Sequence, residues 1–259
     1  MFVSIPRTLT IASNAFLEVV RDRILYTLIL YGAFLLLAAR LLPEIAASTE
    51  AKILPDFGLA AMQILGVLSA IIVGTGLINK EILNRTIFVL VAKPVSRTEF
   101  VLGKHLGLSI VLVLMVALMS VMYYGVMVAN KVSIVPVELL IYSGLLCIQL
   151  SLITAIALFF GVFTSSLLAM LMTVAIYLMG LSSSGMVKFS KLSQNPMIEK
   201  VAGWLYLLLP DLSRLDLKNQ VVYHIIPSQM ALLSSVGYGL LYTLLVLTGT
   251  SLIFSRREF

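Results

Sequence analysis

The chain has 259 residues, of which 60% are hydrophobic and only 12% are charged, and its formal net charge is +6. An average soluble domain carries about twice that share of charged residues, so these few charges could not cover the surface of a water-soluble globule. The high apolar content equally excludes an intrinsically disordered chain. The composition therefore predicts a protein that crosses a membrane several times.

Residues 5–23 are predicted to form an amphipathic helix along the inner membrane surface. Apolar side chains recur there at helical spacing, at Ile5, Leu9, Ala12, Phe16 and Val19. Polar side chains, among them Arg7 and Glu18, lie between them, which gives the helix one apolar and one polar face. The alternative interpretation is a cytosolic extension of the first span.

Six apolar stretches are long enough to cross about 30 Å of hydrocarbon as helices. One of them, residues 137–182, is far too long for a single crossing, and the small and polar residues at 161–166 mark the turn at which it folds back. The predicted spans are about 24–42, 57–79, 106–129, 137–161, 166–182 and 229–254. We therefore expect an all-α membrane protein in which residues 1–259 form a single transmembrane domain.

The charges of the connections predict the orientation. Six spans place both termini on one side, and Lys and Arg are more numerous on that side once the long outer segment 185–227 is set aside. Positively charged connections face the cytoplasm, so both termini are expected there. Within the outer segment, the apolar run 201–209 is too short to span and stops at Pro210, which predicts a re-entrant segment.

The sequence lacks the groups that catalysis or ion coupling would need. No Asp, Glu, Lys, Arg or His falls in the middle of a span, where ion-coupled carriers usually keep one. Neither a phosphate-binding loop motif nor the spacing of a metal site or catalytic triad is present. We therefore expect no catalytic residue, no metal and no cofactor in this chain. Binding of nucleic acid is not expected either, because no basic stretch contains interleaved aromatic residues.

Uncharged polar residues do occur in the middle of the spans. They are Gln63, Ser120, Gln149, Ser151, Thr154, Thr173 and Tyr177. Such residues either form hydrogen bonds between helices or line the route of an amphiphilic substrate. Met115, Met119 and Met122 form a stripe on the third span, whose role is either packing or the handling of a soft metal. Gly103 and Gly107 form a G-x-x-x-G pair, a weak packing signal.

The inner connection at residues 80–105 has the most informative pattern. Glu81 and Arg85 are spaced i,i+4, which supports a helix. Thr86–Ala92 is short and apolar although it lies on the water side, and Pro94 ends it because a residue before proline disfavours the helical conformation. An apolar helix in that place must be covered by lipid headgroups, by the N-terminal helix or by a partner.

The same connection also contains the sequence signals that predict where the third helix begins. Ser96 and Glu99 form the S-x-x-E capping box. Val95 and Phe100 occupy the two positions of a hydrophobic staple. The helix is therefore predicted to begin near Ser96, about two turns before its apolar part.

Residues 81–104 resemble the signature of type-2 ATP-binding-cassette (ABC) exporter permeases, through the run Glu81-x4-Thr86-x7-Pro94-Val95-Ser96-Arg97-Thr98-Glu99-Phe100-x2-Gly103-Lys104. The chain is most similar to the short six-span branch whose best-known members accompany copper-enzyme maturation. It departs from the family pattern at Arg85, where Gly is common, and at Phe88, where an acidic residue is common. The resemblance extends to the surface helix, the Phe163–Ser166 hairpin, the Leu209–Leu212 outer segment and residues 254–259.

The resemblance implies a coupling helix that docks on a cytosolic ABC ATPase, which would bind ATP and Mg. It implies a working unit with a second permease copy or a sister permease, surrounded by the lipid of a bacterial inner membrane. The implied ATPase interface comprises Glu81, Arg85, Thr86, Ile87, Phe88, Val89, Leu90, Pro94, Ser96, Arg97 and Glu99. Among these, Arg97 is expected to have a free side chain, because the capping box does not use it.

Two further sets of residues follow from the same resemblance. The substrate pathway lies between the second and fifth spans, which assigns to it Gln63, Thr173 and Tyr177. The outer segment resembles an external gate, which assigns to it Trp204, Leu209 and Pro210. The expected function is the permease subunit of an ATP-driven exporter for an amphiphilic or hydrophobic substrate. The alternatives are a membrane scaffold that recruits an ATPase without transport, and a passive channel or scramblase.

Overall fold

The structure is a computed structural model, which describes residues 4–20, 25–46, 50–83, 96–192 and 196–256. These residues are almost entirely helical and contain no strand. The helices are α1 (Ile5–Val19), α2 (Leu25–Ala46), α3 (Glu50–Leu83), α5 (Arg97–Ala129), α6 (Pro136–Phe163), α7 (Ser166–Leu192), α8 (Pro196–Leu208), α9 (Lys218–Val222) and α10 (Gln229–Arg256), with a 3₁₀ turn η2 at Leu212–Arg214.

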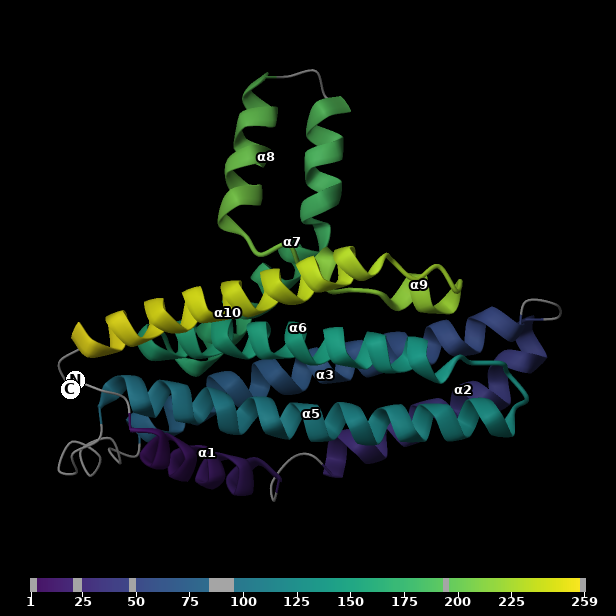
Figure 1. The fold of residues 1–259 in the computed structure, drawn as a ribbon, viewed down its shortest axis with the longest axis horizontal. Coiled ribbons are helices and arrows are strands. Elements are labelled where there is room, and N and C mark those ends of the chain that lie inside the picture. The colour runs from purple at the N-terminus through teal and green to yellow at the C-terminus, as the bar shows by residue number, and fades with distance from the viewer. Residues whose placement is uncertain (1–3, 21–24, 47–49, 84–95, 193–195, 257–259) are drawn as a thin grey trace.

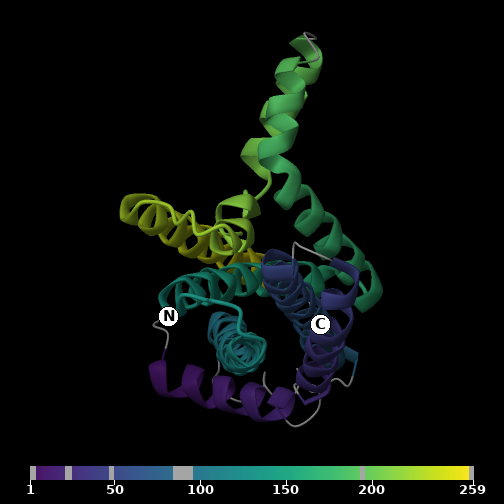
Figure 2. The same cartoon turned by 90° about the vertical axis from the view of Figure 1, so that its right-hand side faces the viewer.

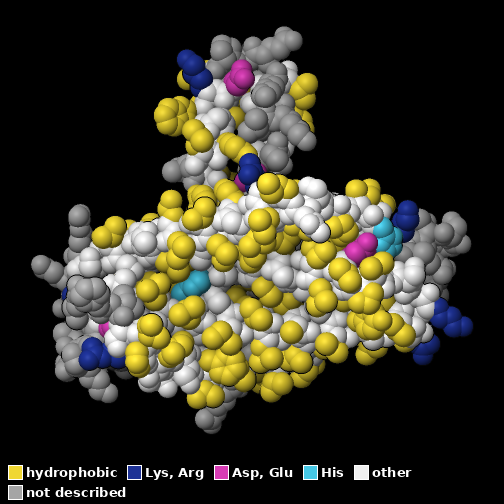
Figure 3. All heavy atoms as spheres, viewed as in Figure 1, with side chains coloured by type: hydrophobic (Ala, Val, Ile, Leu, Met, Phe, Trp, Pro, Cys, Tyr) yellow, Lys and Arg dark blue, Asp and Glu magenta, His cyan; other side chains and the backbone are white. Residues whose placement is uncertain are grey.

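Six helices are long and apolar enough to cross a membrane, namely α2, α3, α5, α6, α7 and α10. They confirm the six predicted spans and the all-α class. The long helices run side by side, and α1, the start of α5 and the end of α10 meet at one end of the bundle (Figure 1), here called the termini end. Charged side chains gather at the two ends and on a projecting hairpin, whereas apolar side chains cover much of the side between them (Figure 3).

Helix α6 forms the centre of the bundle and is the most buried of the six spans. Small residues let its neighbours approach closely: a Cβ added at Gly74 of α3 would lie 2.8 Å from the Ala157 Cβ of α6. Two of the polar mid-span residues form hydrogen bonds between helices, because Ser120 lies 2.8 Å from Ser143 and Ser151 lies 3.3 Å from Ser109. These contacts favour the packing interpretation for these two serines.

The methionine stripe of α5 is part of the core. Met115 and Met119 are fully buried, and the Met122 methyl group fills the space beside Gly32 of α2. Methionine fills irregular gaps well because it is unbranched and flexible. Packing accounts for all three side chains.

Helix α1 is a separate helix that packs on α5, and not an extension of α2 (Figures 1 and 2). Gly103 lies against Ile11, and Gly107 lies against Ala12 and Ala15, because a Cβ added at Gly107 would lie 2.5 Å from the Ala12 carbonyl oxygen. The G-x-x-x-G pair therefore packs against α1 of the same chain. The rest of α1 divides into an exposed apolar face at Ile5, Leu9 and Leu17 and a polar face at Arg7, Thr10 and Asn14.

The outer segment is more helical than predicted. Helix α7 continues to Leu192, ten residues beyond the predicted end of its span, because no proline interrupts it before Pro196. Its second half and α8 form a hairpin, here called the arm, that projects away from the bundle (Figures 1 and 2). The arm exposes large apolar side chains, including Phe189 and Trp204. At the second span, α3 begins at Glu50 and not near 57, and Pro55 lies inside the helix.

Candidate functional site

Most of the predicted ATPase interface lies outside the described residues. This holds for Arg85, Thr86, Ile87, Phe88, Val89, Leu90 and Pro94, whereas Glu81 lies in the last turn of α3. The structure does describe the segment that follows directly, from Ser96 onward. The geometry of the site is therefore built here from the first two turns of α5.

The predicted capping box at the start of α5 is confirmed. The Ser96 hydroxyl accepts a hydrogen bond from the Glu99 backbone N–H at 3.2 Å, and the Ser96 N–H donates to Glu99 Oε2 at 2.7 Å. The other carboxylate oxygen of Glu99 accepts the Ser4 N–H at 2.6 Å. Glu99 therefore satisfies free backbone donors at the starts of both α5 and α1.

The expectation that Arg97 has a free side chain is wrong. Its Nη1 donates to the carbonyl oxygens of Phe254 at 2.7 Å and Ser255 at 3.1 Å, in the last turn of α10. The guanidinium also lies over the Phe254 ring, 5.9 Å from its centre, and the Phe100 ring stacks on that ring at 5.7 Å. Carbonyls at a helix C-terminus lack partners within the helix and carry partial negative charge, so a cation is favourable there.

An ion pair between a buried lysine and a half-buried glutamate also holds this segment. Lys104 Nζ lies 3.8 Å from Glu18 Oε2 of α1, and the Lys104 side chain is only 6% exposed. The first two turns of α5 thus contact α1 through Glu99 and Lys104, and α10 through Arg97 and Phe100. We call these four residues, with Ser96, the α5 junction.

The predicted pathway residues lie on two adjacent spans. Gln63 lies on α3 and Tyr177 on α7, and these two helices pack against each other. The Thr173 hydroxyl donates to the Ala169 carbonyl oxygen of its own helix at 2.7 Å. Gln149 of α6 is 1% exposed, and its amide nitrogen has no hydrogen-bond partner among the described residues.

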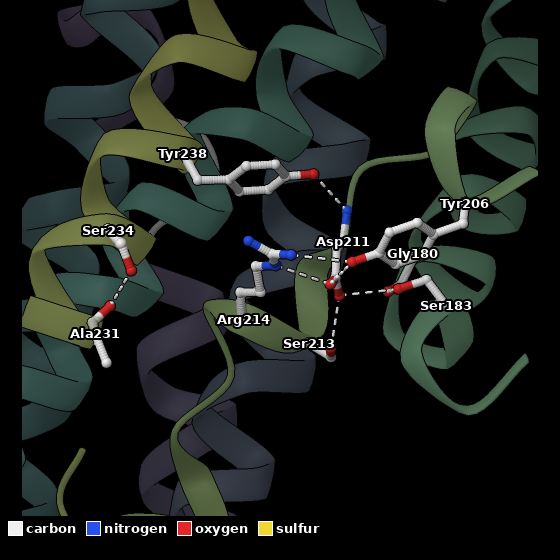
Figure 4. A network of polar contacts seen from close by, with 9 residues as sticks. All are labelled: Gly180, Ser183, Tyr206, Asp211, Ser213, Arg214, Ala231, Ser234 and Tyr238. Carbon is white, nitrogen blue, oxygen red and sulfur yellow. Dashed lines mark hydrogen bonds and ion pairs between the residues drawn. The ribbon is translucent and has the colours of Figure 1, made fainter. Parts of the chain in front are cut away.

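A second polar cluster lies at the base of the arm, around the buried carboxylate of Asp211 (Figure 4). Asp211 Oδ1 accepts hydrogen bonds from the Ser183 hydroxyl of α7 at 2.9 Å and from the Ser213 hydroxyl at 2.6 Å. Oδ2 accepts from Arg214 Nε at 3.0 Å and from the Tyr206 hydroxyl of α8 at 3.2 Å. These residues, with Tyr238, form what we call the Asp211 cluster.

Tyr238 connects this cluster to α10. Its hydroxyl accepts the backbone N–H of Asp211 at 2.7 Å, and the Arg214 guanidinium lies over its ring at 5.2 Å. Close packing also holds α7 against the segment before Asp211, since a Cβ added at Gly180 of α7 would lie 2.7 Å from the Pro210 carbonyl oxygen. The cluster therefore joins α7, α8, η2 and α10.

The hydrogen bonds of the cluster also control its charge. Burial alone would raise the pKa of Asp211, but the bonds from Ser213, Ser183, Arg214 and Tyr206 outweigh it and hold the pKa below its ordinary value. The bonds to Tyr206 and Asp211 raise the pKa of Arg214. Asp211 is therefore ionised and Arg214 charged at neutral pH.

The residues predicted to form the gate lie in two different places in the structure. Leu209 and Pro210 are buried at the base of the arm, directly before Asp211. Trp204 is 74% exposed on α8. The sequence analysis missed Asp211, although the spacing to Arg214 is a readable i,i+3 pair. No local pattern indicates Ser183 or Tyr238, which reach the cluster from other helices.

Groups that could support catalysis are sparse in the described part of the chain. No three or more His, Cys, Asp or Glu residues gather there in an arrangement that could hold a metal ion. One histidine–carboxylate pair, His224 Nδ1 and Glu138 Oε2, lies 2.6 Å apart and joins the segment after α9 to the first turn of α6.

The described residues thus define a membrane protein with six helices able to span a bilayer and polar clusters placed outside the middle of those helices. The chain belongs to the ABC-2 transporter family, because the sequence profile described as ABC-2 family transporter protein matches residues 9–259. This match confirms the predicted resemblance. Members of this family are multi-pass membrane transport subunits, are generally not catalytic, and normally work with a cytosolic ATPase subunit. No curated protein matches the chain.

Proposed function

We propose that this chain is the permease subunit of an ATP-driven exporter that moves an amphiphilic or hydrophobic substrate outward by alternating access. The observation that carries the proposal is the α5 junction. In a chain of this family, it links two other helices directly after the connection expected to meet the ATPase. A displacement of that connection would reach α1, α5 and α10 together.

The ATPase contact is assigned to the connection itself. Thr86–Ala92 supplies the docked apolar surface, and Glu81 and Arg85 flank it. We assign an indirect role to Ser96, Arg97 and Glu99. Their side chains form hydrogen bonds within this chain, so they connect the docked segment to the other helices. The ATPase subunit binds ATP and Mg, and the energy of transport comes from it.

The substrate class follows from the chemistry of the spans. Gln63 and Tyr177 offer uncharged hydrogen-bonding groups on α3 and α7, and Gln149 offers a free amide donor on α6, which packs against both. Large apolar side chains surround these groups. Such a wall suits an amphiphile and disfavours an ion, whose charge would meet no counter-charge. A second copy or a sister permease completes the pathway.

The orientation follows the charge distribution of the connections. Both termini and the ATPase face the cytoplasm of a bacterial inner membrane, and the arm acts at the outer side with Leu209 and Pro210 as parts of the gate. The exposed apolar face of α1 lies in lipid while its polar face meets water.

Docking is tested by placing a charge in the apolar connection. Leu90→Asp should abolish co-purification with the partner ATPase and stop ATP turnover by the complex, because an apolar interface does not accept an unpaired carboxylate. Lys131→Asp, an exposed change beyond the end of α5, is the matched control and should change neither. Unaltered association in the Leu90 variant would overturn the docking assignment.

Reconstitution of the complex into vesicles tests transport itself. The probe is a dye-labelled phospholipid, and the proposal expects its movement to require ATP. Movement without nucleotide by the chain alone would indicate a scramblase. Binding and hydrolysis without movement of this probe or of a panel of amphiphilic dyes would indicate a scaffold.

A further inference from the structure

Helix α10 is held by polar contacts near both of its ends. At the termini end, Arg97 donates to the carbonyls of Phe254 and Ser255. Near the other end, the Tyr238 hydroxyl accepts the Asp211 N–H at the base of the arm. The two anchors are sixteen residues apart, which corresponds to about 24 Å along a helix and approaches the thickness of the hydrocarbon core.

Between these anchors, α10 packs on α6. Gly239 receives the Ile148 side chain, since an added Cβ would lie 2.5 Å from its Cγ2. The buried hydroxyls of Thr243 and Thr250 donate to carbonyls of α10 itself, at 2.7 and 2.8 Å. No proline interrupts Gln229–Arg256. A helix of this kind can shift against its neighbour as one body, as packed helices do in shear motions.

We propose that α10 is a rigid connector between the α5 junction and the Asp211 cluster, with Arg97 and Tyr238 as the positioning residues at its two ends. The proposal rests on the proposed function, in which the ATPase displaces the start of α5. Arg97 then carries the C-terminal turn of α10 along. The displacement moves the Tyr238 hydroxyl relative to the Asp211 N–H and so reorients the base of the arm.

The Asp211 amide proton reports this connection directly, because its acceptor is the Tyr238 hydroxyl. Hydrogen exchange is measured at this amide in the full chain, reconstituted in lipid nanodiscs without an ATPase. Tyr238→Phe removes the acceptor and should speed exchange about fivefold, the factor for one neutral hydrogen bond. Arg97→Ala should speed exchange at the same amide, although its site lies at the far end of α10.

The double variant provides the decisive comparison. Changes at sites this far apart normally act independently. The proposal expects the opposite, namely that Arg97→Ala adds nothing once Tyr238→Phe has removed the bond. Arg97→Lys, which keeps a cationic donor, should restore slow exchange in part. Lys131→Asp, an exposed change beyond the end of α5, is the control and should leave the Asp211 amide unchanged.

Two results would overturn the proposal. One is wild-type exchange at Asp211 in Arg97→Ala, with faster exchange confined to the last turn of α10. The other is an equal acceleration by Arg97→Ala with and without Tyr238, which would mean that Arg97 acts by another route. Because the measurement needs no ATPase, neither result depends on the docking assignment at Leu90.

Discussion

The α5 junction and the Asp211 cluster are both polar, both largely buried and both shared by several helices, yet they are built in different ways. The junction starts from a local pattern, in which Ser96 and Glu99 cap the helix that contains them. The Asp211 cluster takes its side chains from α7, α8, η2 and α10. The junction can therefore persist while its neighbours shift, whereas the cluster exists only when four segments are in place.

The largest effect is expected where the junction depends on close packing. Gly107→Val should push α1 off α5 and lower the free energy of unfolding by about 3 kcal/mol, because the added carbons meet backbone atoms of α1. Thermal unfolding in detergent measures the loss. Gly125→Val on the same helix, where no atom lies within 4 Å of an added Cβ, is the control and should cost less than about 0.5 kcal/mol. Equal losses would show that α1 does not depend on this contact.

The next effect concerns the Asp211 cluster. Asp211→Asn keeps the shape but removes the charge and turns one acceptor into a donor, which should cost about 2 kcal/mol. Trp204, the sole tryptophan, lies on the arm and reports the change through its fluorescence. Ser183→Ala removes one donor of four and should cost less. An unchanged arm in Asp211→Asn would mean that the cluster does not hold it.

A pH titration separates the two regions further. The folded-state pKa of Asp211 lies below its unfolded value of about 3.9. The stability it contributes is therefore fully present above about pH 4 and is lost as the pH falls through the folded-state pKa. Trp204 fluorescence should stay constant from pH 8 to about pH 5 and change below about pH 4. That acid transition should be missing in Asp211→Asn.

The smallest effect is expected at the cap. Ser96→Ala removes the acceptor for the Glu99 N–H and should cost about 1 kcal/mol, since Glu99 still accepts the Ser4 N–H. Ser96→Thr keeps the hydroxyl and should be nearly neutral. Thermal unfolding measures both variants. A loss larger than that of Asp211→Asn would reverse the comparison and make the cap the more important of the two sites.

The sequence alone predicted the features that depend on residues close together in the chain. The spans follow from lengths of apolar residues, and the capping box follows from spacing within one turn. The role of Arg97 was not predictable, because its acceptors lie more than 150 residues away in sequence, at Phe254 and Ser255. Ser183 and Tyr238 were not predictable either, because they too lie far in sequence from the residue that they contact, Asp211. The G-x-x-x-G pair was visible as a motif, but its partner, α1, became known only from the packing.

The division of α1 into a protein face, an apolar face and a polar face has a consequence for how the chain is assembled. Ribosomes complete α1 first, but its docking surface on α5 follows about ninety residues later. At about 5–20 residues per second, that delay lasts roughly 5–20 seconds. During this interval α1 has not yet met α5, and its exposed side chains Ile5, Leu9 and Leu17 favour contact with the bilayer. We therefore expect α1 to stay at the membrane surface until α5, the third span, has been synthesised and can bind it.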